Sequence, residues 1–356
     1  KEILEVLLKS RENDIFRKTS TKSIAHDDFL VFVNEKEVNK FVDLEEDVSK
    51  DIAKQMIEFA LSKEQSLLTQ NQIEQDCFYQ KKPVQNPIAH IVLSQTGGGK
   101  TQVTKQLLKR YNNIICIDSD IYKKYDPLKE FIFKNYPTHF GYLTGIDCYL
   151  HRDYIYNKAI KEKYNILIEL PPSTTQGLFN VDIDFLIKSG YNVVFHILAV
   201  SNINSLLSIH ERYENQLEQN YDMPKLTDLN RALDSFEAMD KTLQELLKNN
   251  KINIKMYKRN PCKLAVINIA CNKQEYLTTF RYLQKNDYNI TIPTIKTRIK
   301  ILQDKMQQRN APQEEIEQLQ KITQIINKNY YQLIKQKVDK PVADQGRRFC
   351  QDNKIS

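Results

Sequence analysis

The sequence has very little glycine. Only 8 of its 356 residues are glycine, and three of these are consecutive, at 97–99. Glycine adopts left-handed backbone conformations at no steric cost, so a chain with few glycines is expected to place them where the backbone is unusual. The scarcity directs attention to the segment "LSQTGGGKTQ" at 93–102.

Other missing features exclude whole classes of protein. No run approaches about eighteen apolar residues, so no membrane-spanning helix is predicted. The six cysteines are scattered without a CxxC pair, which predicts free thiols rather than a disulfide framework or a zinc site. The charged, amphipathic stretch at 1–16 has no secretory cleavage pattern.

The charges are nearly balanced, with 52 basic and 45 acidic residues and a net charge of +7. No concentrated basic face interleaved with aromatics is apparent, which disfavours a nucleic-acid partner but suits a small anionic ligand. A hydrophobic content of 41% over 356 residues is enough for a sizeable core and two or three structural units.

Short apolar runs alternate with stretches of helical spacing in the middle of the chain. The runs predict strands at 88–94, 113–120, 165–170, 192–200, 252–259 and 263–270. Helical stretches are predicted between them at 149–163, 179–190, 203–218 and 227–249. This alternation is typical of an α/β fold, with a parallel sheet covered by helices on both faces.

The two ends of the chain lack this alternation. Residues 1–80 are predicted to form a mostly helical region, joined by a proline-containing linker at 79–87 to a domain at 85–275. Residues 285–345 predict two helices broken near 310–312, as a hairpin or coiled-coil-like arm. We expect this arm to pack on the core, and the last dozen residues to form a tail.

The triple glycine has the setting of a phosphate-binding loop, or P-loop. It follows a predicted strand, ends in Gly99-Lys100-Thr101 and opens a predicted helix. Amides around Gly97 and Gly98, with the helix N-terminus, are expected to bind the phosphates of ATP or GTP. Lys100 would reach the β and γ phosphates, and the Thr101 hydroxyl would bind Mg²⁺. The fold is therefore predicted to be P-loop kinase-like.

A serine replaces the first glycine of the motif. Ser94 occupies the position at which the chain turns out of the strand. A serine is tolerated there if its φ is negative.

Acidic residues end the next two predicted strands. Asp118 and Asp120, two apart on a strand, are expected to point the same way, at the edge where a ligand binds. One can hold Mg²⁺ through water, and the other can accept a proton from an attacking hydroxyl. Glu169 ends the third strand and can orient a substrate hydroxyl.

Candidate cations follow the fourth predicted strand. Arg212 lies on the predicted helix at 203–218, and Lys225 and Arg231 come after it. Phosphoryl transfer relies on such cations to offset the charge of the moving group. Arg212 is the preferred candidate.

Four segments, in order, are similar to motifs of the zeta toxin family, kinases of small molecules in bacterial toxin–antitoxin systems: "TGGGKT", "IICIDSDIYKKYDP", "YNILIE" and "AVSNINSLLSIHERYE", over roughly 85–260. The resemblance implies that Lys100 belongs to the P-loop with Thr101, that Asp120 is the catalytic base and that Glu169 contacts substrate. It also implies that Arg212 reaches the ATP phosphates, and that the acceptor is the 3′-hydroxyl of the amino sugar in UDP-N-acetylglucosamine.

The sequence departs from the family in two further places. Lys225 stands where the family has a second phosphate-facing arginine. The family's Gly-Thr-x-Arg stretch, which shapes the substrate pocket, is replaced by the residues at 170–173. We assign Asp118 to the substrate side with Glu169. Because the pocket-shaping stretch is replaced, the acceptor can also be another nucleotide, such as a dinucleotide cofactor.

The resemblance also implies partners and a location. Family antitoxins are helical and block the nucleotide site, so the partner is expected to be a helical antitoxin or a cis-inhibitory segment within 1–80. The expected location is the bacterial cytosol, with a translocated effector as the alternative. An alternative of another class is a nucleotide-switched protein that binds a partner through its C-terminal helices.

Overall fold

The computed structural model describes residues 58–136, 140–174, 181–221, 224–259, 266–269, 272–287 and 291–338. Most of the predicted N-terminal helical region, and the whole of the predicted tail, lie outside the described residues.

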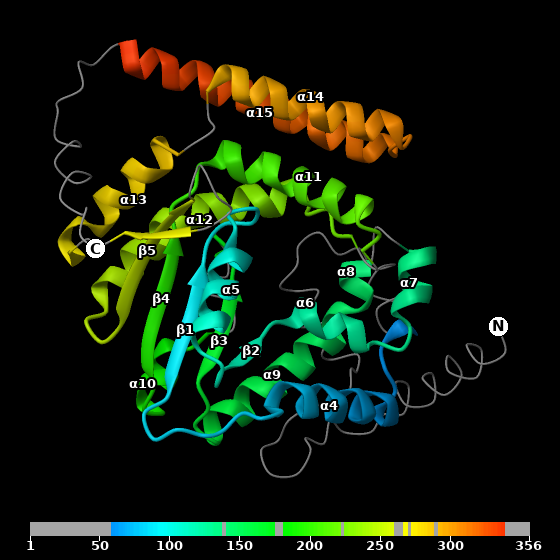
Figure 1. Cartoon of the computed structure of the whole chain (residues 1–356), viewed down its shortest axis with the longest axis vertical. Helices are drawn as coiled ribbons and strands as arrows, with labels where there is room; N and C mark the ends of the chain where they lie inside the picture. The colour runs from blue at the N-terminus through cyan, green and yellow to red at the C-terminus, as the bar shows by residue number, and fades with distance from the viewer. Residues whose placement is uncertain are drawn as a thin grey trace.

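A six-stranded sheet forms the centre of the molecule, in the order β2-β3-β1-β4-β5-β6 (Figure 1). The strands are β1 (Ile88–Leu93), β2 (Ile115–Ile117), β3 (Ile166–Leu170), β4 (Asn192–Leu198), β5 (Asn253–Arg259) and β6 (Val266–Ile269). The first five are parallel, and β6 pairs antiparallel with β5 at the edge. The α/β, P-loop kinase-like fold predicted from the sequence is confirmed.

Helices follow the strands as the alternating pattern predicts, with bounds shifted by a few residues. They are α4 (Lys63–Phe78), α5 (Lys100–Arg110), α6 (Ser119–Tyr122), α7 (Lys129–Asn135), α8 (Phe140–Leu143), α9 (Gly145–Lys161), α10 (Ile183–Lys188), α11 (Asn202–Glu218), α12 (Leu229–Lys248) and α13 (Tyr276–Lys285). Among these described helices, none is both long and apolar enough to cross a membrane.

Both faces of the sheet are buried, which explains why the strands read as continuous apolar runs. Successive side chains of a strand point to opposite faces. Ile91 and Leu93 of β1 pack in the larger core, whereas Val92 packs in a smaller core with Val103 and Leu107 of α5. The strand that leads into the P-loop is therefore held from both sides.

Helix α4 shares the core of the sheet. Ile73 is fully buried in the larger core, and α4 contacts α9 (Figure 1). Ser62 and Gln65 form a capping box that fixes where α4 begins. Residues just before the predicted linker thus pack on the domain that follows it.

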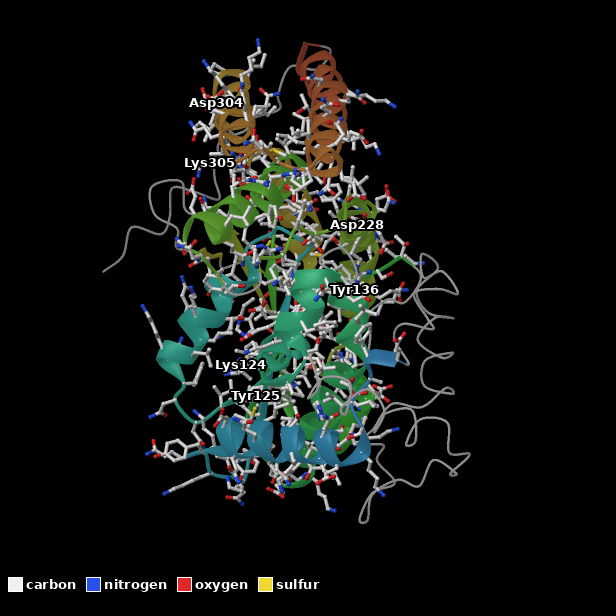
Figure 2. All side chains as sticks on the ribbon, turned by 90° about the vertical axis from the view of Figure 1, so that its right-hand side faces the viewer. Lys124, Tyr125, Tyr136, Asp228, Asp304 and Lys305 are labelled. Carbon is white, nitrogen blue, oxygen red and sulfur yellow. The ribbon has the colours of Figure 1, made fainter. Side chains whose placement is uncertain are left out.

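Helices α14 (Ile292–Gln308) and α15 (Gln313–Val338) form an antiparallel hairpin. The sequence predicts two helices here, separated by a break near 310–312. The hairpin lies across α11 at one end of the molecule (Figure 1). Figure 2 shows Asp304 and Lys305 on this end, far from Tyr125, whose hydroxyl donates to Asp76 of α4 at 2.5 Å. The hairpin packs against α11 through an apolar cluster separate from the larger core.

Candidate nucleotide and acceptor site

The P-loop begins where β1 leaves the sheet. The amide of Ser94 donates to the Leu170 carbonyl of β3 at 3.4 Å, and φ of Ser94 is not positive. The serine in place of the first glycine is thus accommodated, as the sequence analysis expects. Gly97 and Gly99 carry the unusual backbone, with φ of +76° and +98°.

The triple glycine is also required by lack of space. A Cβ on Gly97 would lie 2.2 Å from the Ser205 carbonyl oxygen of α11. A Cβ on Gly98 would lie 2.0 Å from Oγ of Ser94. Atoms this close cannot be accommodated without moving the loop, so Gly97 and Gly98 stand where no other residue fits.

Lys100 is the first residue of α5, and its ammonium group folds back over the loop. It donates to the carbonyl oxygens of Ser94 at 3.0 Å and Gln95 at 3.3 Å. Burial lowers the pKa of Lys100 to about 8, and the carboxylate of Glu169 partly opposes this. Thr101 follows it at the exposed start of the helix.

Hydrogen bonds from Gln95 and Thr96 fix the P-loop to neighbouring elements. The side-chain amide of Gln95 donates to the Val200 carbonyl at 2.7 Å and to Oγ of Ser205 at 2.8 Å. The amide of Thr96 donates to Oγ of Ser235 in α12 at 2.9 Å. The loop is thus pinned to both α11 and α12.

Sequence reasoning missed Arg259, the last residue of β5. Its guanidinium donates to the carbonyl of Gly98 at 3.3 Å, to the carbonyl of Gly97, and to Oγ of Ser208 at 2.9 Å. The only signal was its position at the carboxyl end of a predicted parallel strand, the edge at which ligands bind.

The prediction that Asp118 and Asp120 share one face of a strand is wrong. Strand β2 ends at Ile117; Asp118 caps α6, and Asp120 lies within that helix. The Asp118 carboxylate accepts from the Asp120 amide at 2.9 Å, which starts the helix instead of continuing the strand. Burial, together with the charges of Asp120 and Glu169, raises the pKa of Asp118 to about 6.

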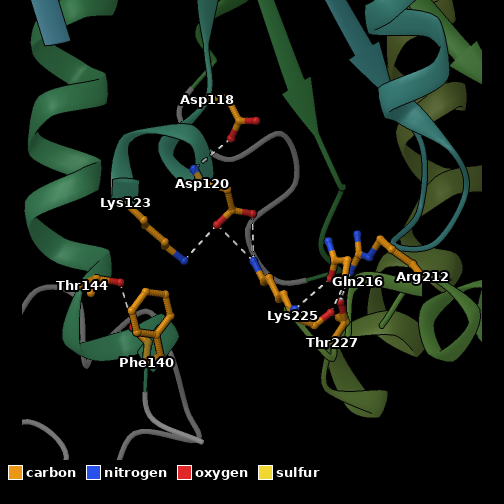
Figure 3. A network of polar contacts seen from close by, with 9 residues as sticks. All are labelled: Asp118, Asp120, Lys123, Phe140, Thr144, Arg212, Gln216, Lys225 and Thr227. Atoms are coloured by element: carbon orange, nitrogen blue, oxygen red, sulfur yellow. Dashed lines mark hydrogen bonds and ion pairs between the residues drawn. The ribbon is translucent and has the colours of Figure 1, made fainter. Parts of the chain in front are cut away.

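Two ammonium groups converge on Asp120 (Figure 3). Nζ of Lys225 lies 2.8 Å and 3.1 Å from its two carboxylate oxygens, and Nζ of Lys123 lies 2.9 Å from one of them. Burial raises the pKa of Asp120, but Lys225 and Lys123 outweigh it and hold that pKa well below its usual range. Lys123 was also missed by sequence reasoning, although its spacing of three from Asp120 places both on one helical face.

Arg212 lies beside the loop that carries Lys225 (Figure 3). Its guanidinium donates to Oγ1 of Thr227 at 2.9 Å and to the Lys225 carbonyl at 3.4 Å. The Lys225 amide in turn donates to Oε1 of Gln216 at 2.9 Å. Burial lowers the pKa of Arg212, while Asp120 and Glu169 raise it.

These interactions join the predicted site residues into one site. Glu169, near the end of β3, acts on the pKa values of Lys100, Asp118 and Arg212. Asp120 acts on the pKa values of Asp118 and Arg212. The P-loop cation, both aspartates, the glutamate and the helix α11 arginine thus lie near one another at the carboxyl edge of the sheet.

The family model described as zeta toxin matches residues 70–272. The chain belongs to the zeta toxin family. Two relatives named "Toxin zeta" are similar to it. The one from Streptococcus pyogenes is 30% identical over 137 residues, 38% of this chain and 47% of the relative. The one from Streptococcus agalactiae is 26% identical over 167 residues, 46% of this chain and 54% of the relative.

The chain spans about half the length of these zeta toxin relatives. A solved structure from work on the PezAT chromosomal toxin-antitoxin system of Streptococcus pneumoniae matches with a TM-score of 0.52. It is 19% identical, and the match covers 70% of this chain and 97% of that one. This likeness supports the fold, a P-loop kinase-like sheet shared with zeta toxins.

Proposed function

We propose that the protein is an ATP-dependent kinase that transfers the γ-phosphate to a hydroxyl of a nucleotide sugar. The 3′-hydroxyl of UDP-N-acetylglucosamine is the first candidate acceptor. The observation that carries the proposal is the glycine-rich loop closed by Lys100, together with Asp120, on which the ammonium group of Lys225 lies. Membership of the zeta toxin family supports it.

ATP would bind at the P-loop. Backbone amides of the loop and of the start of α5 form an anion site, and the helix dipole favours negative charge there. Lys100 would exchange its hydrogen bonds to the Ser94 and Gln95 carbonyls for bonds to the β and γ phosphates. The cation is thus held in place before the nucleotide arrives.

The donor groups near the loop fit Mg²⁺. The described residues contain no group of three or more His, Cys, Asp or Glu side chains that could hold a metal alone. Magnesium in kinases is held by one or two protein oxygens together with water and phosphate, so the Thr101 hydroxyl, with waters positioned by the Asp118 carboxylate, would suffice. When bound, the ion neutralises charge on the β and γ phosphates.

Asp120 would act as the base for the transfer. The acceptor oxygen forms a bond to the γ-phosphorus, the bond from that phosphorus to the ADP oxygen breaks, and the hydroxyl proton passes to Asp120. Lys225 and Arg212 would then offset the charge of the moving phosphoryl group.

The acceptor side differs from the family pattern. Glu169 would orient the acceptor hydroxyl, but the next residues are Leu170-Pro171-Pro172-Ser173. Thr174 is fixed to α12, since its amide donates to the Asp234 carboxylate at 3.0 Å. Because this stretch lacks the family's arginine, a dinucleotide cofactor is the alternative acceptor.

The acceptor is tested by incubating the protein with ATP, Mg²⁺ and a panel of nucleotide sugars and dinucleotides. Mass analysis should show one added phosphate on a single member of the panel, and none with Lys100→Ala. ATP turnover without a phosphorylated acceptor would contradict the kinase proposal and favour the nucleotide-switched binding protein.

In the cell, we propose that this activity inhibits growth and is blocked by an antitoxin or by residues 1–57 of the chain. The structure similar to this chain comes from work on a toxin-antitoxin system, which supports the first partner. Comparing the ATP affinity of the full chain with that of a chain starting at residue 58, which keeps α4, tests the second. Equal affinities would discard inhibition in cis.

A further inference from the structure

The α14–α15 hairpin holds the helix that carries Arg212. Both lie in one apolar cluster, outside the larger core of the sheet, in which Leu207 of α11 packs with Leu302 of α14 and Ile322 of α15. The hairpin lies beyond residues 70–272, which match the family model. It therefore lies outside the part of the chain that the family model matches, and it contacts the site helix directly.

The polar contacts of the hairpin surround Arg212 in the sequence. Arg298 of α14 forms a bidentate pair with Glu211, at 2.6 and 2.8 Å. Arg309 forms another with Glu214, at 2.7 and 2.9 Å, and Glu214 is only 2% exposed. Bidentate Arg–carboxylate pairs fix geometry as well as position. The residues on both sides of Arg212 are therefore held by the hairpin.

A second contact is connected to the Arg212 guanidinium through Thr227. The side-chain amide of Gln318 in α15 donates to the Thr227 carbonyl at 2.9 Å, and the Thr227 hydroxyl accepts from Arg212 at 2.9 Å. The same loop carries Lys225, whose ammonium group lies on Asp120. Hydrogen bonds thus connect the hairpin, through the 224–228 loop, to both proposed phosphate-site cations, Arg212 and Lys225.

From these contacts we infer that the hairpin positions Arg212 and Lys225 for the triphosphate, with Gln318 as the positioning residue. The inference rests on the proposed ATP site. Gln318 touches neither nucleotide nor acceptor, and its effect passes through Thr227 to Arg212. The hairpin thus makes the phosphate site of this domain depend on a segment outside the zeta toxin match.

The test is a double-mutant cycle on ATP affinity, measured by calorimetry. Gln318→Ala should weaken ATP binding roughly two- to tenfold, the effect of one lost hydrogen bond. Gln313→Ala is the matched control, because the Gln313 side-chain amide donates within α15, to Glu317. In an Arg212→Ala background, Gln318→Ala should cause a clearly smaller loss, because only its effect through Lys225 remains. An equal loss in both backgrounds, or none in either, would overturn the inference.

Amide hydrogen exchange separates this inference from the proposed function. Gln318→Ala should speed exchange in residues 224–228, without a change in melting temperature, whether or not ATP is present. If the unmodified protein binds no ATP, the proposed function fails, and exchange alone decides whether Gln318 holds the loop. Unchanged exchange there would overturn the positioning role.

Discussion

At the scale of single residues, the backbone of the P-loop allows only glycine at position 97. Its φ is +76°, and a Cβ added there would lie 2.2 Å from the Ser205 oxygen, so any side chain moves the loop. Gly97→Ala should weaken ATP binding about five- to 150-fold, because strain of this kind costs about 1–3 kcal/mol. Gly141→Ala is the control, since a Cβ there meets no atom of the described residues within 4 Å. Equal ATP affinities by calorimetry would contradict the assignment.

The ion pairs of Asp120 set the pH range in which it can act as a base. Because Lys225 and Lys123 together outweigh burial, the carboxylate stays ionised far below neutral pH. Lys225→Gln removes the largest of these attractions, so the pKa of Asp120 rises. The acid limb of the kcat/KM profile should then shift to higher pH. An acid limb at the same pH in Lys225→Gln and in the unmodified protein would contradict the assignment of Asp120 as the general base.

At the scale of elements, β5 supports the P-loop through its last residue. Arg259 donates to the Gly98 and Gly97 carbonyls, and therefore holds the loop in which Gly97 and Gly99 adopt left-handed conformations. Arg259→Ala should weaken ATP binding about tenfold, since charge-assisted hydrogen bonds of this kind contribute roughly 1.5–3 kcal/mol. Lys258→Ala, one residue earlier on the strand, should leave the affinity unchanged. A similar loss in both variants would argue against a specific role.

Elements were predicted better than their boundaries and contacts. The six strands and the helix after the P-loop follow from apolar runs and from Gly99-Lys100-Thr101. The end of β2 does not, because Asp118 can either extend a strand or cap a helix, and only the Asp120 amide bond decides between these. Arg259 approaches the loop from 161 residues away along the chain, a contact that local pattern does not contain.

The contacts of the C-terminal helices could not be predicted from local sequence pattern either. Their periodicity predicts a hairpin, but not the ion pairs of Arg298 and Arg309 with α11, whose glutamate partners lie nearly a hundred residues earlier. Long-range charge pairs of this kind depend on the assembled fold. The dependence of Arg212 on the hairpin was therefore visible only in the structure.

At the scale of the whole molecule, four buried histidines of the described residues make the fold sensitive to acid. Burial lowers the pKa of His90, His151 and His210 to about 4, and that of His196 to about 3. Below about pH 6.5 the unfolded chain takes up protons that the folded chain does not, so stability falls as the pH drops towards 4. Urea unfolding should show a lower midpoint at about pH 5 than at about pH 7.5.

His151 offers the cleanest variant for this prediction. Neither of its ring nitrogens has a hydrogen-bond partner within the described part of the chain. His151→Phe should therefore reduce the loss of stability between pH 7.5 and pH 5 by about 2 kcal/mol, the linkage expected for such a pKa difference. An unchanged pH dependence would show that His151 does not resist protonation in the folded protein.

The central claim is that the P-loop binds a triphosphate while Asp120 activates an acceptor hydroxyl across the same site. The most direct measurement compares ATP affinity and phosphoryl transfer in Asp120→Asn. Because Lys225 and Lys123 lose their carboxylate partner, the variant should bind ATP at least as tightly as the unmodified protein. Its transfer rate should fall at least about a hundredfold, the usual contribution of a general base. Transfer close to the original rate would contradict the account.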